Sequence, residues 1–424
     1  MGNTDIGVFL GTHWFSVRGT YRISQRGLRC PSPQIKDRKE MEIAIFCGAR
    51  PNFIKVAPVI RQIKNLQKQG RDITFTLIYV GAEDDPTLET TIFSDLGIDR
   101  PTVFLDITCQ NLNELTGQVM SKFEDYLQKQ HTDAVIVVDD LASTMAVSIV
   151  TKKQGILLAH IAAGTRSFDI KMPKEINRLV IDGLSDILFT AGISNNSIAN
   201  REGAELSKVY CVGNILIDNI RHCQKQIEDA GDAVYTELKN CGIATAKDAT
   251  GNRGARYLVF TINRKALLAD RDNLLAMLSG MVESAGNVPI IAPIRDTAVE
   301  VITSLGLHRG LNLHNFHIVK PLPYLEFAYL TKHALGIITD SGNVAEEATF
   351  NQVPCITLNG YTEHIETVKQ GTNVLVGEDP EKLKKAVYNM VKDNWKTSTI
   401  PDRWDGRVAE RVVKIITDAV NNQK

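Results

Sequence analysis

The sequence predicts an α/β protein with two doubly wound domains in tandem. Short β-branched runs alternate with amphipathic stretches from Met41 onward, which is the pattern of β-α-β units. The alternation comes in two series, separated by a polar stretch at 245–256. The 424 residues suffice for two or three domains of about 100–200 residues each. Sheets built from such units are parallel, covered on both faces, and bind ligands at the carboxyl ends of their strands.

Each element follows from its local pattern. A buried strand at 42–47 precedes a helix at 53–66, whose apolar side chains recur at helical spacing. The same reasoning predicts strands at 73–80, 134–138, 156–161, 187–191 and 209–212, and helices at 112–127 and 141–153. The second series predicts strands at 257–262, 288–293, 316–319, 336–339 and 354–358, and helices at 273–284 and 381–391. We expect domains at 41–208 and 209–403, with a ligand cleft between them.

Composition excludes several classes of protein. The balance of 48 Lys and Arg against 49 Asp and Glu excludes a polybasic nucleic-acid binder. No apolar run approaches the roughly 20 residues of a membrane span. The seven cysteines are scattered, without zinc-like spacing, so we expect reduced thiols, a cytoplasmic location and no metal. No G-x-G-x-x-G or Walker A motif occurs, so neither standard dinucleotide nor P-loop binding is predicted.

The N-terminal segment differs from the rest of the chain. Residues 1–40 show no sustained period of 2 or 3.6, so we expect an irregular extension. It is either a partner-docking segment or, as we favour, an extension translated upstream of a start at Met41.

Two strand-to-helix turns carry groups suited to a nucleotide. In the turn at 47–55, Arg50 and Lys55 flank a helix N-terminus, where an anion is favoured; the alternative is a solvated basic turn. In the turn at 339–347, Asp340 and Ser341 are good helix caps, and the amide of Gly342 could hold a phosphate. Glu347 is placed to accept both hydroxyls of a ribose. The alternative there is a plain capped helix.

Two further turns carry charged groups. The pair Asp139-Asp140 ends a strand, where crowding of like charges could supply a base. Alternatively, and preferably on this motif alone, one Asp caps the helix that begins near Leu141. The segments 163–166 and 173–178 are rich in groups that bind phosphate or hydroxyls, or else form a surface helix with ordinary ion pairs.

Several segments are informative as a set. They are G-x-R-P-x-x-I-K (48–55), D-x-x-S-T (140–144), A-G-x-R (163–166), P-x-E-I-N-R (173–178), V-G-N-x-x-I-D (212–218), T-D-S-G-x-x-x-E-E-A (339–348), T-E (362–363) and G-T-N-x-L-V-G (371–377). In order and spacing, this set resembles the non-hydrolysing UDP-N-acetylglucosamine 2-epimerase family, from about residue 41 to about residue 420.

The resemblance implies a GT-B-like pair of Rossmann-like domains with a UDP-sugar in the cleft. It also implies a C-terminal helix at about 404–424 that packs on the first domain, no cofactor, and a cytoplasmic homodimer of polysaccharide biosynthesis. Members of the family interconvert UDP-GlcNAc and UDP-ManNAc by eliminating UDP, which leaves a 2-acetamidoglucal, and adding UDP back with C2 inverted. By position, the UDP and substrate contacts are expected from Arg50, Lys55, Asn263, Phe327, Ser341, Gly342, Glu347 and His364. The reaction centre is expected at Asp140, Arg166, Glu175 and Arg178.

The chain departs from the family pattern where protons should move. Ala162 stands where H-[VI]-E-A-G-L-R has a catalytic Glu, Lys174 where P-E-E-x-N-R has another, and Asn263 where T-x-H-R-x-E-N has a His. Such groups typically contribute about 10²–10⁴-fold each. His364 also replaces an Arg on the phosphate side, which makes its contact weaker and pH-dependent.

Three functions remain open. The first, which we rank ahead, is a divergent UDP-HexNAc 2-epimerase; it requires that Asp139, Asp140, Glu175 or His160 take over proton transfer. The second is a GT-B hydrolase or transferase acting on a nucleotide sugar, and the third is a UDP-sugar-binding protein without turnover. Many bacterial family members bind a second UDP-GlcNAc through a Gly-Gln-His segment. That segment reads Gly81-Ala82-Glu83 here, so we expect one UDP-sugar per chain.

Overall fold

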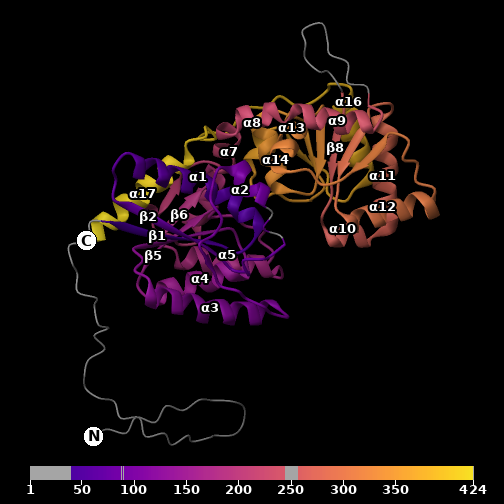
Figure 1. Ribbon diagram of the computed structural model, residues 1–424. Helices are drawn as coiled ribbons and strands as arrows, with labels where there is room; N and C mark the ends of the chain where they lie inside the picture. The colour runs from indigo at the N-terminus through magenta and orange to yellow at the C-terminus, as the bar shows by residue number, and fades with distance from the viewer. Residues whose placement is uncertain (1–39, 87, 89, 244–255, 424) are drawn as a thin grey trace, which may run out of the picture. The chain divides into compact units, whose positions relative to one another are not determined.

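The structure is a computed structural model that describes residues 40–86, 88, 90–243 and 256–423. Two parallel sheets organise this part of the chain, each with helices on both faces (Figure 1). The predicted pair of doubly wound α/β domains is therefore confirmed. Of the extension expected at 1–40, only Glu40 lies within the described residues, and of the polar stretch at 245–256 only Arg256 does.

The first sheet has seven strands in the order β3-β2-β1-β4-β5-β6-β7. They are β1 (Met41–Cys47), β2 (Ile73–Tyr79), β3 (Val103–Phe104), β4 (Ala134–Val138), β5 (Leu157–Ile161), β6 (Ile187–Thr190) and β7 (Val209–Cys211). The connecting helices are α1 (Arg50–Lys68), α2 (Thr90–Leu96), α3 (Leu112–Lys129), α4 (Ala142–Lys153), α5 (Pro173–Leu184), α6 (Ile193–Arg201) and the 3-10 helix η1 (Leu206–Lys208). The strand order reverses at β1, so a crevice opens beyond the carboxyl ends of β1 and β4.

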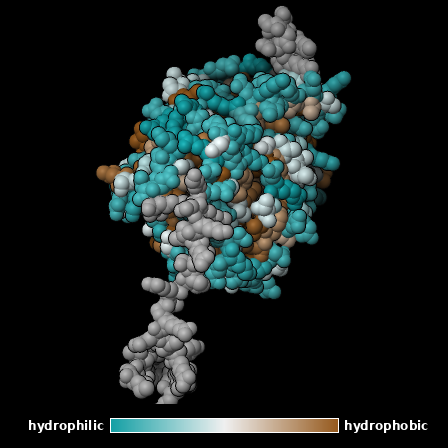
Figure 2. Space-filling model, turned by 60° about the vertical axis from the view of Figure 1, so that its left-hand side comes forward, coloured by the Kyte–Doolittle hydropathy of each residue, from teal (hydrophilic) through white to brown (hydrophobic). Residues whose placement is uncertain are grey.

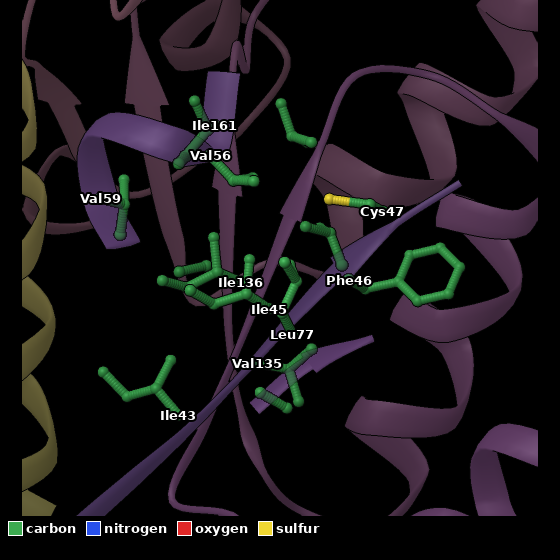
Figure 3. Close-up of a cluster of buried hydrophobic side chains, with 14 of the residues drawn as sticks. Ile43, Ile45, Phe46, Cys47, Val56, Val59, Leu77, Val135, Ile136 and Ile161 are labelled. Carbon is green, nitrogen blue, oxygen red and sulfur yellow. The ribbon is translucent and has the colours of Figure 1, made fainter. Parts of the chain in front are cut away.

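The core of the first domain fills both faces of this sheet. α3, α4 and α5 lie along one face, and α1 lies along the other beside α17 (Val408–Gln423) (Figure 1). Side chains alternate along β1: Ile43 and Ile45 lie on the side of the sheet where Val59 of α1 lies, whereas Phe46 meets the ring of Phe123 of α3 at 6.1 Å between centroids (Figure 3). Each such buried side chain contributes about 1.5–3 kcal/mol.

The second sheet has six strands in the order β10-β9-β8-β11-β12-β13. They are β8 (Leu258–Thr261), β9 (Ile290–Pro293), β10 (Phe316–Val319), β11 (Gly336–Thr339), β12 (Cys355–Thr357) and β13 (Asn373–Leu375). The helices are α7 (Leu216–His222), α8 (Gln224–Asp229), α9 (Gly231–Asn240), α10 (Lys265–Ala269), α11 (Arg271–Ala285), α12 (Asp296–Arg309), α13 (Tyr324–Lys332), α14 (Gly342–Asn351), α15 (Glu366–Lys369) and α16 (Pro380–Val391).

This second sheet is also buried on both faces. Leu258 and Phe260 of β8 belong to the apolar cluster formed with α11, α12 and α16, whereas Val259 between them belongs to the cluster formed with α9, α13 and α14. The near-continuous apolar strands of the sequence follow from this double coverage.

One domain boundary differs from the expectation. A boundary between residues 208 and 209 would place β7 in the second domain, but β7 pairs with β6 in the first sheet. The second domain therefore begins beyond Cys211. At the other end of the chain, α17 contacts α1 and buries Val412 and Ile416 in the core of the first domain.

The surface is mostly polar. On the face drawn in Figure 2, hydrophilic residues predominate and hydrophobic ones occur in small groups. Among the described residues, no helix has both the length and the apolar composition needed to cross a membrane.

Candidate active site

A polar cavity of about 200 Å³ is lined by residues of both domains. The carboxyl ends of β4, β5 and β11 lead into it, which is where doubly wound sheets hold their ligands. Its lining consists of Lys55, Asp139, Asp140, His160, Ala162, Thr165, Arg166, Arg178, Asp182, Ser341, Gly342, Asn343, Glu346, Glu363 and His364.

The structure brings together part of the predicted site. Lys55, Asp140, Arg166, Arg178, Ser341, Gly342 and His364 line this cavity. Glu175 lies directly behind Arg178, with 3.2 Å between Oε2 and Nη1. Arg50, Asn263, Phe327 and Glu347 are not part of this lining.

Arg178 of α5 is the centre of a cluster of carboxylates. Its Nε donates to Asp140 Oδ2 at 2.8 Å, its Nη1 pairs with Glu175, and its Nη2 pairs with Glu363 from the second domain. Burial alone would raise the pKa of Asp140, but the charges of Lys174 and Arg178 outweigh burial and hold that pKa below its ordinary value. Asp140 is therefore ionised at neutral pH. Asp140 does not cap α4. The N-cap residue of this helix is Leu141, and the helix has no capping hydrogen bond from a side chain.

A second cluster surrounds Asp182, one turn further along α5. Asp182 Oδ1 lies 2.6 Å from His160 Nδ1, and its Oδ2 lies 2.8 Å from Arg166 Nη1 and accepts the amide of Gly164 at 3.0 Å. Burial opposes its ionisation, but the hydrogen bond and charge of His160 and the charge of Arg166 lower the pKa of Asp182 overall. Arg166 is thus fixed at the wall of the cavity.

Lys55 of α1 is held by Asp139, which directly follows β4. The Lys55 Nζ lies 2.5 Å from Asp139 Oδ1, and Asn52 Nδ2 donates to Asp139 Oδ2 at 2.8 Å. Burial lowers the pKa of Lys55, but the charge and hydrogen bond of Asp139, together with the charges of Glu346 and Asp140, more than compensate, and the net effect is a raised pKa. The cavity therefore presents a charged ammonium group.

The three substituted family positions differ in their surroundings. Ala162 follows β5 and lines the cavity. Lys174, on the first turn of α5, lies with its Nζ 3.3 Å from Asp140 Oδ1, so a cation stands beside the carboxylate where the resemblance predicts another acid. Asn263 is exposed, and its amide N–H donates to Asp340.

The N-terminus of α14 forms the wall contributed by the second domain. Ser341 is its N-cap residue, and Ser341, Gly342 and Asn343 line the cavity, so the positive end of the helix is directed there. The prediction that Asp340 caps this helix is wrong: its Oδ2 accepts the amides of Asn263 and Arg264, both at 2.6 Å. The side chain of Ser341 makes no capping bond.

His364 lines the cavity and has one ring nitrogen without a partner in the described part of the chain. Its Nε2 lies 3.5 Å from Glu346 Oε1, and its Nδ1 is buried without a hydrogen-bond partner among the described residues. A buried polar atom without a partner costs about 1–3 kcal/mol.

Glu347 is buried on α14, next to Glu346. Burial and the neighbouring charge of Glu346 raise the pKa of Glu347 to about 8. Tyr324 lies nearby on α13. Burial raises the pKa of Tyr324, and the charge of Glu347 raises it further. Phe327 follows on the same helix, half-buried. The residues expected at the uracil and the ribose thus lie on two neighbouring helices, α13 and α14.

Sequence reasoning did not single out several residues of the lining. Asp182 lies four residues after Arg178, so helical spacing could have placed both on one face of α5. Glu346 adjoins the expected ribose residue and accepts a hydrogen bond from Asn214 Nδ2. Within the described ranges, no group of three His, Cys, Asp or Glu is arranged to hold a metal ion.

Two doubly wound domains that share a cavity with fixed cations and a helix N-terminus define a GT-B-like protein of the kind that binds nucleotide sugars. The chain belongs to the UDP-N-acetylglucosamine 2-epimerase family, whose model matches residues 64–417.

Relatives agree over nearly the whole chain. A UDP-N-acetylglucosamine 2-epimerase homolog of Methanococcus maripaludis is 33% identical over 89% of this chain and 99% of its own length. The UDP-N-acetylglucosamine 2-epimerase of Methanocaldococcus jannaschii is 33% identical with the same coverage. The crystal structure of the Methanocaldococcus jannaschii enzyme, in complex with UDP-GlcNAc and UDP, matches at a TM-score of 0.75 and 32% identity, covering 89% of this chain and 100% of that one.

Proposed function

We propose that this chain is a UDP-HexNAc 2-epimerase that interconverts UDP-GlcNAc and UDP-ManNAc, or a related pair of sugars. The observation that carries the proposal is the position of Arg178. It holds Asp140 and Glu363 in the same cavity that presents Lys55 and the N-terminus of α14, and Glu175 lies directly behind it. A leaving diphosphate and a sugar ring that loses a proton require such neighbouring cationic and acid–base groups.

The nucleotide contacts are proposed by position. Lys55, His364 and the amides at Ser341 and Gly342 would bind the diphosphate, with Arg50 beside the first turn of α1. Glu347 would accept the ribose hydroxyls, and Phe327 would contact the uracil. Asn263 would lie at the sugar. Support comes from the cavity that Lys55, Ser341, Gly342 and His364 share, and from the buried Nδ1 of His364.

The reaction is proposed to proceed by elimination and re-addition. The proton leaves C2, the C2–H electrons form the C1=C2 double bond, and the C1–O bond breaks with its electron pair on the β-phosphate oxygen. Re-addition reverses these steps with C2 inverted. Arg178 and Arg166 would stabilise the developing charge beside Asp140 and Glu175, and no cofactor is proposed.

Product analysis by NMR tests this function. UDP-GlcNAc incubated with the chain should yield UDP-ManNAc at a rate proportional to protein concentration. Free UDP with a reducing sugar would instead identify a hydrolase, and line broadening without product would identify a binding protein. The relative from Pseudomonas aeruginosa named UDP-2,3-diacetamido-2,3-dideoxy-D-glucuronate 2-epimerase, 29% identical over 88% of this chain, motivates a second trial with that class of sugar.

Binding is tested separately by calorimetry with UDP. Arg50→Ala should weaken UDP binding by about 1.5–3 kcal/mol, the range for a charge-assisted hydrogen bond. Glu347→Ala should weaken it by about 0.5–1.5 kcal/mol at neutral pH, because a carboxyl with a pKa of about 8 is mostly protonated there. Unchanged affinity in both variants would contradict the site.

We also propose a cytoplasmic homodimer of polysaccharide biosynthesis, supported by family membership.

A further inference from the structure

The carboxylate missing at Ala162 has a counterpart on the neighbouring strand. β4 and β5 are parallel, and their register pairs Val138 with Ile161. Asp139 and Ala162 are therefore the first residues beyond the two strand ends, side by side, and the Asp139 amide points to the Ile161 carbonyl at 3.4 Å. Both residues line the cavity. A carboxylate on Asp139 thus enters the space from the strand next to the substituted position.

Asp139 is held in an uncommon backbone conformation. Its φ is +60°, in the left-handed region that few non-glycine residues adopt, although Asp is among the more tolerant. Its carbonyl faces His160 Nε2 at 3.1 Å. Non-glycine residues in this region are strained and cluster at functional sites. The conformation directs the carboxylate toward Lys55 and the cavity.

The orientation of this carboxylate is fixed from behind. Asn52 is almost fully buried, and its Oδ1 accepts the amides of Gly48 and Ala49 at 2.9 and 3.0 Å. Its Nδ2 is therefore the atom that donates to Asp139 Oδ2. Asp139 Oδ1 remains with Lys55, whose ammonium group an incoming diphosphate would also bind. Substrate binding would thus weaken the hold of Lys55 on Asp139.

Two other carboxylates of the cavity, Asp140 and Asp182, are more heavily engaged. Asp140 is bound by Arg178 and Lys174, and Asp182 by His160 and Arg166. None of these four partners is a proposed ligand of the diphosphate, so substrate binding should leave these ion pairs intact. Asp139 differs from these two because the cation that binds it is the proposed phosphate ligand Lys55.

We infer that Asp139 is the catalytic carboxylate that moves the C2 proton on one face of the sugar, in place of the glutamate that the family carries at position 162. This inference rests on the proposed function. The Asp139 carboxylate would take the C2 proton while the C2–H electrons form the C1=C2 bond and UDP leaves with the C1–O electron pair. On return it would give the proton back to the same face. The epimer of opposite configuration needs a second group at the other face, which Asp139 does not supply.

The test uses Asp139→Asn in D₂O with each epimer in turn. Interconversion should fall at least about 100-fold. C2 deuteration should be lost for one epimer and retained for the other, because only one face loses its base. If Asp139 had only a structural role, its replacement would suppress C2 deuteration of both epimers equally. Calorimetry should show UDP binding that is not weakened, since Lys55 remains.

Two further variants complete the test. Asp139→Asn combined with Ala162→Glu should recover at least about tenfold of the lost rate, because the carboxylate returns from the adjacent strand. Asp186→Asn removes a similar partner from Lys152, 2.7 Å away and outside the cavity, and should leave the rate within about twofold of the unaltered chain. Interconversion by Asp139→Asn within about threefold of the unaltered rate, or equal loss of deuteration in both epimers, would overturn the inference. An unaltered chain that deuterates neither epimer would contradict the proposed function itself, and the inference with it.

Discussion

Arg178 forms an ion pair with Glu363, so one guanidinium of the first domain binds a carboxylate of the second. The same guanidinium also binds Asp140 and Glu175, which are both buried. Burial lowers the pKa of Arg178, but the charges of Glu363 and Asp140 more than compensate, and its pKa is raised overall. Arg178 therefore stays positively charged, and its charge offsets the mutual repulsion of the three carboxylates.

Arg178→Ala is expected to lower the free energy of unfolding by about 3–5 kcal/mol, because it leaves buried carboxylates without their partner. Glu363→Gln should cost less than about 1 kcal/mol, since the Glu363 side chain is 34% exposed. Urea denaturation of both variants at neutral pH measures the difference. Equal losses in the two variants would contradict the central position of Arg178.

The raised pKa of Glu347 predicts that the free energy of unfolding depends on pH. In the unfolded chain a Glu titrates near about 4.3, whereas in the folded protein burial and then Glu346 raise the pKa of Glu347 to about 8. Between these values the folded state holds one proton more, so the free energy of unfolding falls as pH rises, by at most about 1.4 kcal/mol per pH unit. The stabilisation is complete below the unfolded pKa and lost above about 8.

Glu347→Gln should remove this contribution, because an amide of the same shape does not titrate. Urea denaturation of both proteins between about pH 6 and pH 9 tests the expectation. The difference in stability between the unaltered chain and the variant should shift steadily in favour of the variant as pH rises. Parallel pH profiles would show that Glu347 is ionised in the folded state.

The substituted family positions predict a gain of function. Ala162→Glu, Lys174→Glu and Asn263→His together should speed C2 exchange, since each restores a group typically worth about 10²–10⁴-fold. Lys171→Glu, an exposed change in the same loop, is the charge control and should have no effect. No gain in a triple variant that folds and binds UDP would mean that the loops differ from the family geometry, and that Ala162 and its companions do not limit the rate.

The turn after β2 predicts a single ligand per chain. Glu83 and Asp84 are exposed there, and Asp85 accepts a hydrogen bond from Tyr79 at 2.8 Å. Repulsion of a diphosphate should reach about 1 kcal/mol per close charge pair even at the dielectric constant of water. Calorimetric titration with UDP-GlcNAc should therefore give one site. Two sites, or a sigmoidal dependence of rate on substrate, would contradict this prediction.

Local sequence patterns predicted most strands, because buried parallel strands are unbroken apolar runs. Ala134–Val138, Phe316–Val319 and Gly336–Thr339 match the expected ranges. The two-residue strand β3 and the edge strand β13 were missed. A strand that short has no detectable period, and its pairing is decided by the neighbouring strand.

The site was predicted less completely, because its contacts join distant parts of the chain. The residue types in the strand-to-helix turns predicted a ligand site at Lys55, Ser341 and Gly342, and all three line the cavity. It could not show that Asp340 binds the amides of Asn263 and Arg264, more than 70 residues away, instead of capping α14. Nor could it show that Asp139, across from Ala162, turns its carboxylate toward Lys55, because that direction depends on a left-handed φ and on Asn52.

Deuterium incorporation tests the central claim most directly. The unaltered chain is incubated with UDP-GlcNAc in D₂O, and the C2 position of both UDP-sugars is followed by NMR. Epimerisation by elimination and re-addition predicts UDP-ManNAc that carries deuterium at C2, approaching equilibrium with UDP-GlcNAc. Free UDP with a reducing sugar, or UDP-GlcNAc that keeps its C2 proton while bound, would contradict the account.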